Sequence, residues 1–183
     1  MAAPTQMFQH ALTALKGWPS PVALDFAAKL SANVTLDPVP AGVCVHVNTS
    51  GEFELGAILL AMPMFLLQGS RDFDVSNQSS TVAPWYGIAP KGVLSALVAT
   101  GGYELETTEF DTGQTYLVNE HLTAVDSQSA SNGGSLTNQS LGVLYHASSM
   151  ENRCGVVSRG KYTNAYGVSV LGFFPIYLPG TAT

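Results

Sequence analysis

Alternating apolar and polar positions predict short β-strands along most of the chain. Residues 43–48 read Val-Cys-Val-His-Val-Asn, the period of a strand with one buried face. Ser50-Gly51 predicts a turn, and a further strand starts at Phe53. Residues 57–67 are continuously apolar, which favours a strand buried on both faces, with a helix as the alternative. Pro63 favours an edge position or a bulge for that strand.

The segment 92–125 predicts a meander of three strands around which the rest is organised. Residues 93–100 are apolar and rich in small or β-branched side chains, and two glycines then allow a turn. Residues 103–108 alternate aromatic, aliphatic or threonine side chains with polar ones, and a third strand runs from Tyr116 to Leu122. Such a meander is typical of a β-rich protein.

The C-terminal third continues the same pattern. Residues 126–140 are rich in Ser, Gln, Asn and Gly and predict a surface loop or a long hairpin tip. Strands are predicted again at 141–146, 155–158 and 167–178. About nine strand-like segments without a convincing long helix predict an all-β protein, an antiparallel β-barrel or β-sandwich.

The N-terminal residues 1–37 differ from the rest and predict an arm on a domain of residues 38–183. Apolar side chains between Met7 and Leu15 are spaced as on one face of a short helix, which Gly17-Trp18-Pro19 ends. Residues 20–37 alternate with period 2, which predicts a long extended strand. The arm either packs on its own domain or reaches a neighbouring subunit.

Charge narrows the classes of function. Charged residues make up 11% of the chain, against about 25% in a typical protein. Either neighbours cover much of the surface, or the protein has a neutral polar exterior. The net charge of −6 and the lack of a basic stripe disfavour nucleic-acid binding. Arg153, Arg159 and Lys161 are loosely grouped and predict a solvated turn.

The N-terminus, the most apolar run and the two cysteines give little information about function. The N-terminus does not resemble a signal peptide, and the most apolar run, from Leu55 to Leu67, is too short for a membrane span. We therefore expect no membrane association. Cys44 and Cys154 have no informative spacing, and buried free thiols are the prediction in the absence of a secretion signal.

No nucleophile, phosphate-binding or metal-ligand motif is recognisable, and the acidic residues are the strongest candidates for chemistry. Glu104 and Glu106 share one face of a predicted strand, roughly 6.5–7 Å apart by strand rise, a spacing compatible with inverting glycosidases. Glu109 and Asp111 offer oxygen ligands for Ca²⁺. Carboxylates on an exposed strand are usually solvated, so this acidic face is expected to be solvated or turned toward a partner, and we expect no enzyme, no metal and no cofactor.

Aromatic side chains suggest either stacking on sugar rings or packing at an interface. The residues concerned are Trp18, Trp85, Tyr86, Tyr162 and Tyr166. Packing in a core or interface is the favoured interpretation, because aromatic residues bury large areas there.

The order of several segments resembles tailed-bacteriophage head decoration (cement) proteins. The segments are Val39–Val47, Met64–Leu66, Asp72–Val75, Ala99–Asp111, Tyr116–Ala124, Gly155–Gly160 and Phe174–Pro179. The resemblance covers roughly residues 38–180 and includes no diagnostic catalytic motif.

The resemblance implies a structural virion protein, a homotrimer made in the host cytoplasm, that binds the major capsid protein on the capsid exterior and stabilises the head. Engaging several weak contacts at once makes such binding strong. The expected interface residues are Phe8, Leu12, Leu15, Trp18, Trp85 and Tyr86. The alternatives are another assembly subunit, such as a tail-tube or minor capsid protein, and a carbohydrate-binding β-sandwich module.

Overall fold

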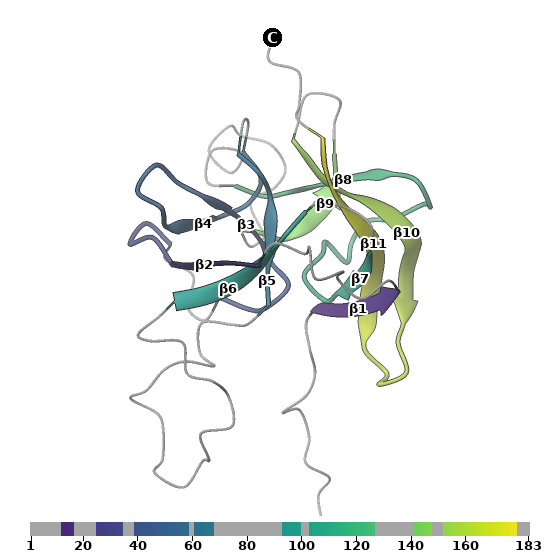
Figure 1. The fold of residues 1–183 in the computed structure, drawn as a ribbon. Coiled ribbons are helices and arrows are strands. Elements are labelled where there is room, and N and C mark those ends of the chain that lie inside the picture. The colour runs from purple at the N-terminus through teal and green to yellow at the C-terminus, as the bar shows by residue number, and fades with distance from the viewer. Residues whose placement is uncertain are drawn as a thin grey trace, which may run out of the picture.

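The computed structural model describes residues 12–16, 25–34, 39–58, 61–67, 93–99, 103–126, 141–147 and 152–178. In chain order the strands are β1 (Leu12–Lys16), β2 (Asp25–Lys29), β3 (Cys44–Val47), β4 (Phe53–Leu55), β5 (Met64–Leu66), β6 (Val93–Val98), β7 (Glu104–Thr107), β8 (His121–Ala124), β9 (Leu144–His146), β10 (Arg153–Thr163) and β11 (Ser169–Leu178). They form two antiparallel sheets, which confirms the predicted all-β class (Figure 1). The described residues contain no helix that is long and apolar enough to cross a membrane.

One sheet has six strands in the order β1-β7-β11-β10-β8-β9. The long hairpin of β10 and β11 lies at its centre, and β1 and β9 are its edges. The sheet curls, because residues that follow β7 return to β9. The Asp111 amide donates to the Leu144 carbonyl at 2.8 Å, and the Leu144 amide donates to the Glu109 carbonyl at 3.0 Å. The curl gives a half-barrel with an apolar inner face.

The other sheet has five strands in the order β2-β6-β5-β3-β4. Its edges also approach each other, because Leu30, directly after β2, forms a bridge with Phe53 at the start of β4. The Ser31 amide donates to the Phe53 carbonyl at 2.9 Å. A cluster of buried side chains that includes Phe53, Leu66 and Leu94 packs together on this sheet. Removing this apolar area from water is the main force that holds such a curl.

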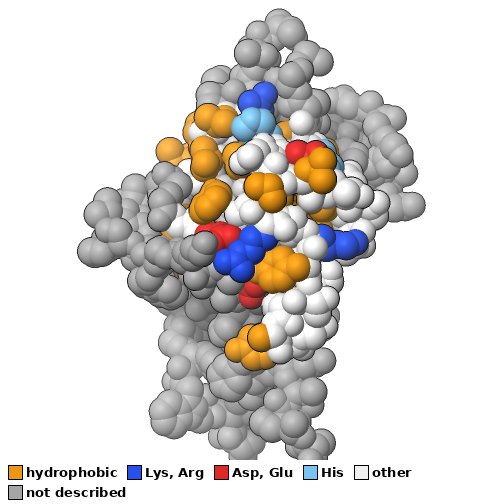
Figure 2. All heavy atoms as spheres, turned by 90° about the vertical axis from the view of Figure 1, so that its right-hand side faces the viewer, with side chains coloured by type: hydrophobic (Ala, Val, Ile, Leu, Met, Phe, Trp, Pro, Cys, Tyr) orange, Lys and Arg blue, Asp and Glu red, His pale blue; other side chains and the backbone are white. Residues whose placement is uncertain are grey.

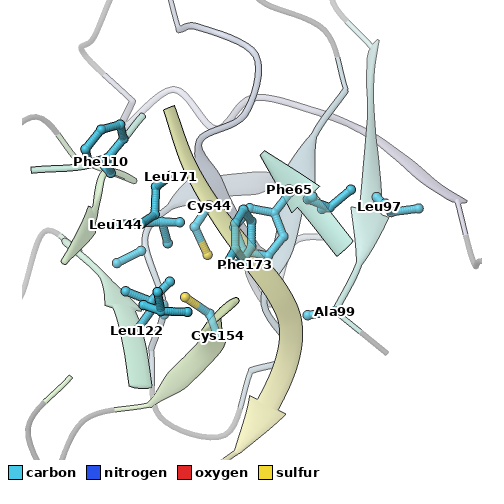
Figure 3. Packing of buried hydrophobic residues seen from close by; sticks show 14 of the residues in the cluster. Cys44, Phe65, Leu97, Ala99, Phe110, Leu122, Leu144, Cys154, Leu171 and Phe173 are labelled. Carbon is cyan, nitrogen blue, oxygen red and sulfur yellow. The ribbon is translucent and has the colours of Figure 1, made fainter. Parts of the chain in front are cut away.

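A further apolar cluster joins the two sheets. Phe65 of β5 and Phe173 of β11 pack with their ring centroids 5.0 Å apart, and neither side chain is exposed. Leu122 and Leu144 extend the cluster into the half-barrel, as Figure 3 shows. The sheets also touch through their backbones at Gly56, where a Cβ atom would lie 2.3 Å from the Val125 carbonyl oxygen. The core thus makes the two sheets one packed unit.

The N-terminal prediction is wrong in part. Residues 12–16 form strand β1, which pairs with β7, and not the end of a helix. A helix of two turns is not stable by itself, whereas the free edge of β7 offers hydrogen-bond partners to an extended segment. The long strand predicted over 20–37 is shorter than expected: β2 covers Asp25–Lys29, and the chain turns at residues 32–33. Residues 1–11 lie outside the described part.

Three other predicted elements need correction. Among the described residues of the apolar run, 57–58 and 61–67, only Met64–Leu66 form a strand, β5, which lies inside its sheet between β3 and β6. Pro63 precedes that strand, where its missing N–H interrupts no ladder. The predicted third strand of the meander starts later than expected, at His121, because residues 112–113 and 118–119 form turns. The predicted loop 126–140 lies outside the described residues apart from Asp126.

The cations near the C-terminus do not form a solvated turn. Arg153, Arg159 and Lys161 all belong to β10, an eleven-residue strand. The register of β10 against β11 shifts between Val157 and Gly160, so the strand bends there. This bend lies beside the two acidic side chains described next.

Candidate functional site: the outer face of β7, β11 and β10

Glu104 and Glu106 lie on the face of β7 that points away from the core. Leu105 of the same strand, and Tyr103 before it, belong to the core between the sheets. Because side chains alternate along a strand, the two glutamates share the opposite face, as predicted. They are nevertheless buried, with 2% of Glu104 and 6% of Glu106 exposed. The prediction that this acidic row is solvated is therefore wrong.

Strand β10, together with Asn164 directly after it, supplies partners for both carboxylates. Arg159 Nε donates to Glu104 Oε1 at 2.9 Å, and its Nη2 lies 3.5 Å from Oε2. The Tyr162 hydroxyl donates to Glu106 Oε2 at 2.7 Å, and Asn164 Nδ2 lies 3.5 Å from Oε1. Figure 2 shows basic and acidic side chains side by side among hydrophobic ones on the face where β10 and β11 lie. We call Glu104, Glu106, Arg159, Tyr162 and Asn164 the outer polar cluster.

A glycine lets these side chains meet across an intervening strand. β11 lies between β7 and β10, and its Gly172 pairs with Glu106 on one side and with Gly160 on the other. A Cβ atom on Gly172 would lie 3.1 Å from Arg159 Cβ, tighter than most real contacts. The missing side chain leaves the Arg159 stem room to cross β11 toward Glu104. The sequence contains this glycine, but only the strand order reveals its position.

The electrostatics follow from this geometry. The hydrogen bond and the charge of Glu104 raise the pKa of Arg159 above its ordinary value. Burial, followed by the hydrogen bond to Glu106, raises the pKa of Tyr162 to about 12. Arg159 therefore stays charged and Tyr162 stays a hydroxyl donor through the neutral range. Both carboxylates act as acceptors in a structural network between strands.

The other two acidic candidates shape the chain after β7. Glu109 accepts a hydrogen bond from the Thr108 hydroxyl at 2.9 Å, and burial raises its pKa. Asp111 Oδ1 accepts from the Gly113 amide at 2.9 Å, which is typical of an Asx turn. Among the described residues no three His, Cys, Asp or Glu side chains gather as metal ligands.

The structure places few of the predicted interface residues. Phe8, Trp18, Trp85 and Tyr86 lie outside the described residues. Leu12 and Leu15 belong to β1 at the edge of the six-stranded sheet, and their side chains are not described. The aromatic residues proposed for sugar stacking differ from each other: Tyr162 is engaged with Glu106, whereas Tyr166, at the tip of the β10–β11 hairpin, is 79% exposed. The other candidates for stacking, the two tryptophans and Tyr86, are not described.

Sequence reasoning missed an exposed apolar pair, Leu117 and Val118, which we call the apolar turn. Their exposed fractions are 62% and 56%. The sequence alone placed Val118 within a strand, and the only signal to the contrary is the following Asn119. That residue has φ of 74°, a conformation that asparagine tolerates better than most residues at the third position of a turn.

Hydrogen bonds on both sides hold the apolar turn in place. The Glu120 amide donates to the Leu117 carbonyl at 3.1 Å, and the Leu117 amide donates to Glu120 Oε2 at 2.6 Å. The Asn119 amide donates to the Val157 carbonyl of β10 at 2.9 Å. The two apolar side chains thus project from a turn whose backbone is fixed to the central hairpin.

A ring contact supports the same segment from the other side. His146 of β9 stacks on Tyr116, with ring centroids 4.9 Å apart and an interplanar angle of 6°. Its Nδ1 lies 3.4 Å from Glu120 Oε2, and its Nε2 contacts the Thr115 carbonyl oxygen. The turn therefore rests on β9 as well as on β10.

Comparison of the chain with protein-family models, curated proteins and solved structures found no match. The function is therefore inferred from the chain's own residues.

Proposed function

We propose that the protein is a structural virion component that binds the outer surface of an assembled phage capsid and stabilises the head. The observation that carries this proposal is the contrast between its two conspicuous groups of side chains. The carboxylates of Glu104 and Glu106 are buried in contacts between strands, whereas Leu117 and Val118 are held in solvent on a fixed turn. Two adjacent apolar side chains held in solvent on a fixed support offer a contact surface to another protein.

The rigidity of the apolar turn favours binding. Ordering a mobile loop on association costs free energy, and a turn that is already fixed avoids most of that cost. The low content of charged residues, 11% of the chain, is consistent with a surface that neighbours cover. The capsid as the partner comes from the resemblance of residues 38–180 to decoration proteins.

The proposed assembly is a homotrimer on the capsid exterior, in contact with the major capsid protein. In a trimer three apolar turns act together, so that contacts that are weak one at a time give strong binding. The proposal includes no catalytic activity, no cofactor and no nucleic acid.

Substitution of the apolar turn tests this function. The double variant Leu117→Ser/Val118→Ser removes both exposed apolar side chains and no described core contact. Met62→Ser is the matched control, because Met62 is also apolar and 49% exposed but lies beside the five-stranded sheet. We expect the double variant to lose at least tenfold in affinity for tailed-phage heads that lack their decoration protein, while the control binds as the unchanged protein does.

The readout is occupancy on purified heads after sedimentation, with the mass in solution measured by light scattering. Binding of the unchanged protein to none of several head types would refute the proposal. Equal losses of affinity in the double variant and in Met62→Ser would show that the apolar turn is not the capsid-binding surface. Rings or tubes of the pure protein would favour a tail-tube subunit.

A test of the N-terminal arm in capsid binding requires a deletion that leaves β1 intact. Deleting residues 1–19 would remove a paired strand of the six-stranded sheet, so a loss of binding would not be informative. Deleting residues 1–11 keeps β1 and removes Phe8. We expect this shorter deletion to weaken capsid binding without lowering the melting temperature, and unchanged occupancy would exclude a role for these eleven residues.

Tyr166 favours one alternative, a carbohydrate-binding module. Its ring is 79% exposed at the hairpin tip, where it is free to stack on a sugar. Binding on a glycan array that Tyr166→Ser abolishes, together with no binding to heads, would favour this alternative over the capsid.

A further inference from the structure

Cys44 and Cys154 approach each other in the core from different sheets. Cys44 begins β3 of the five-stranded sheet, and Cys154 belongs to β10 of the six-stranded sheet. Both are free thiols with no exposed surface. In Figure 3 their sulfur atoms point toward one another between Leu122 and Phe173. The sequence did predict buried free thiols, but not that they are neighbours.

The two thiols interact directly. Burial and a hydrogen bond with the Cys44 thiol raise the pKa of Cys154 well above its ordinary value. A hydrogen bond between thiols requires that the sulfur atoms be close, and a disulfide requires the same two sulfurs to face each other. The raised pKa disfavours the thiolate in the closed core, so this pair stays reduced until the core opens.

The backbone holds the Cys44 side of the pair in position. The Cys44 amide donates to the Gly142 carbonyl at 2.9 Å, and its own carbonyl accepts from the Gly56 amide at 2.9 Å. Cys154 lies in β10 next to Gly155, which pairs with both β11 and β8. The two sulfurs therefore meet from strands with little freedom to separate.

We propose that Cys44 and Cys154 are a redox site that forms a disulfide between the two sheets when the chain meets a low-molecular-weight disulfide such as oxidised glutathione. One cysteine, as thiolate, attacks the glutathione disulfide during an opening of the core, which forms a mixed disulfide and releases one glutathione thiolate. The second cysteine then attacks the protein sulfur of the mixed disulfide and releases the second glutathione. The protein loses two protons and two electrons, and oxidised glutathione becomes two reduced glutathiones.

The cross-link would join β3 to β10 through the middle of the core. It would close a loop of residues 44–154, and a cross-link that closes a long loop restricts the unfolded chain strongly. The sequence has two cysteines, so no other pairing within one chain competes. The site would convert a protein folded under reducing conditions into one whose sheets are covalently joined after exposure to an oxidising medium.

The experiment uses the full chain, folded under reducing conditions and then incubated with oxidised glutathione. Thiols are blocked in denaturant, the mass is measured, and a digest is searched for a peptide that joins the segments of Cys44 and Cys154. We expect a monomer that has lost two hydrogen atoms, with no glutathione attached and no blocked thiol. We also expect its melting temperature to rise by more than about 5 °C and to return after reduction.

Four results would overturn the proposal, three of them concerning the product of oxidation. These three are two blocked thiols after prolonged oxidation, a stable glutathione adduct, or a disulfide found only between chains. A cross-linked monomer that melts at a lower temperature than the reduced protein would also overturn it, because the bond would then distort the core. The variants Cys44→Ala and Cys154→Ala should show no oxidant-dependent rise, and the measurements on the unchanged chain decide the question even if both variants misfold.

Discussion

The outer polar cluster makes a quantitative prediction about stability. Glu104→Gln keeps the shape of the side chain and removes its charge, and Arg159→Met keeps an unbranched stem over Gly172 and removes the guanidinium. The double variant carries both changes and completes a double-mutant cycle. The cycle isolates the coupling between the two charged groups from the other contacts of Glu104.

The magnitude follows from the exposure of the two partners. Breaking a fully buried ion pair costs about 3–5 kcal/mol, whereas an exposed pair contributes about 0–1 kcal/mol. Glu104 is 2% exposed, but the Arg159 side chain is 43% exposed, so water and salt screen one partner. We therefore expect Arg159→Met to lower the free energy of unfolding by about 2 kcal/mol, with a coupling of about 1–2 kcal/mol to Glu104→Gln.

Urea unfolding at neutral pH, followed by intrinsic fluorescence, measures the four free energies. Glu52→Gln, in the turn between β3 and β4, is the control and should change stability by less than about 0.5 kcal/mol. A coupling below about 0.5 kcal/mol would refute a stabilising ion pair across β11. A gain in stability for Glu104→Gln would mean that the desolvation penalty of the Glu104 carboxylate exceeds its attraction to Arg159.

Two further predictions concern backbone packing and alkaline pH. Gly56→Ala should destabilise by about 3 kcal/mol or more, because φ is 97° and the Cβ would lie 2.3 Å from the Val125 carbonyl oxygen. Gly51 has φ of 79° with no atom within 4 Å of an added Cβ, so Gly51→Ala should lower the free energy of unfolding by only about 1 kcal/mol. Equal losses of stability for the two variants in urea unfolding would contradict a steric cause at Gly56. The raised pKa of Tyr162 means that the folded state binds this proton more tightly than the unfolded state. Stability should therefore fall as pH rises from about 10 toward 12, and the fall should be smaller in Tyr162→Phe, as thermal unfolding across that range will show.

The strands with a clear period of 2 or a continuous apolar run between turn signals were predictable from the sequence. An alternating pattern, which suits a sheet with one face toward a core, correctly predicted strands over Cys44–Val47, Phe53–Leu55 and Glu104–Thr107. The strand over Val93–Val98 was predicted from its apolar, small and β-branched residues. Prediction failed where the spacing of the apolar residues was compatible with more than one kind of secondary structure. Residues 12–16 have helical spacing, yet they pair with the free edge of β7. The availability of that edge depends on the whole fold.

The candidate site was predictable only in part. Alternation placed Glu104 and Glu106 on one face, and the structure agrees. Their burial was not predictable, because the partners Arg159 and Tyr162 follow more than fifty residues later and reach them across β11. Strand order alone brings those segments together.

The sequence by itself determined the class of this protein: strands, no recognisable reaction motif, few charges and two cysteines suited to a core. These properties are local or compositional, and each can be read without knowing which segments meet. The tertiary structure decided that the acidic row is buried, that Leu117 and Val118 project from a fixed turn, and that Cys44 faces Cys154. The physical reason is that hydrogen bonds and burial depend on neighbours in space, and the order of strands in the two curled sheets sets those neighbours.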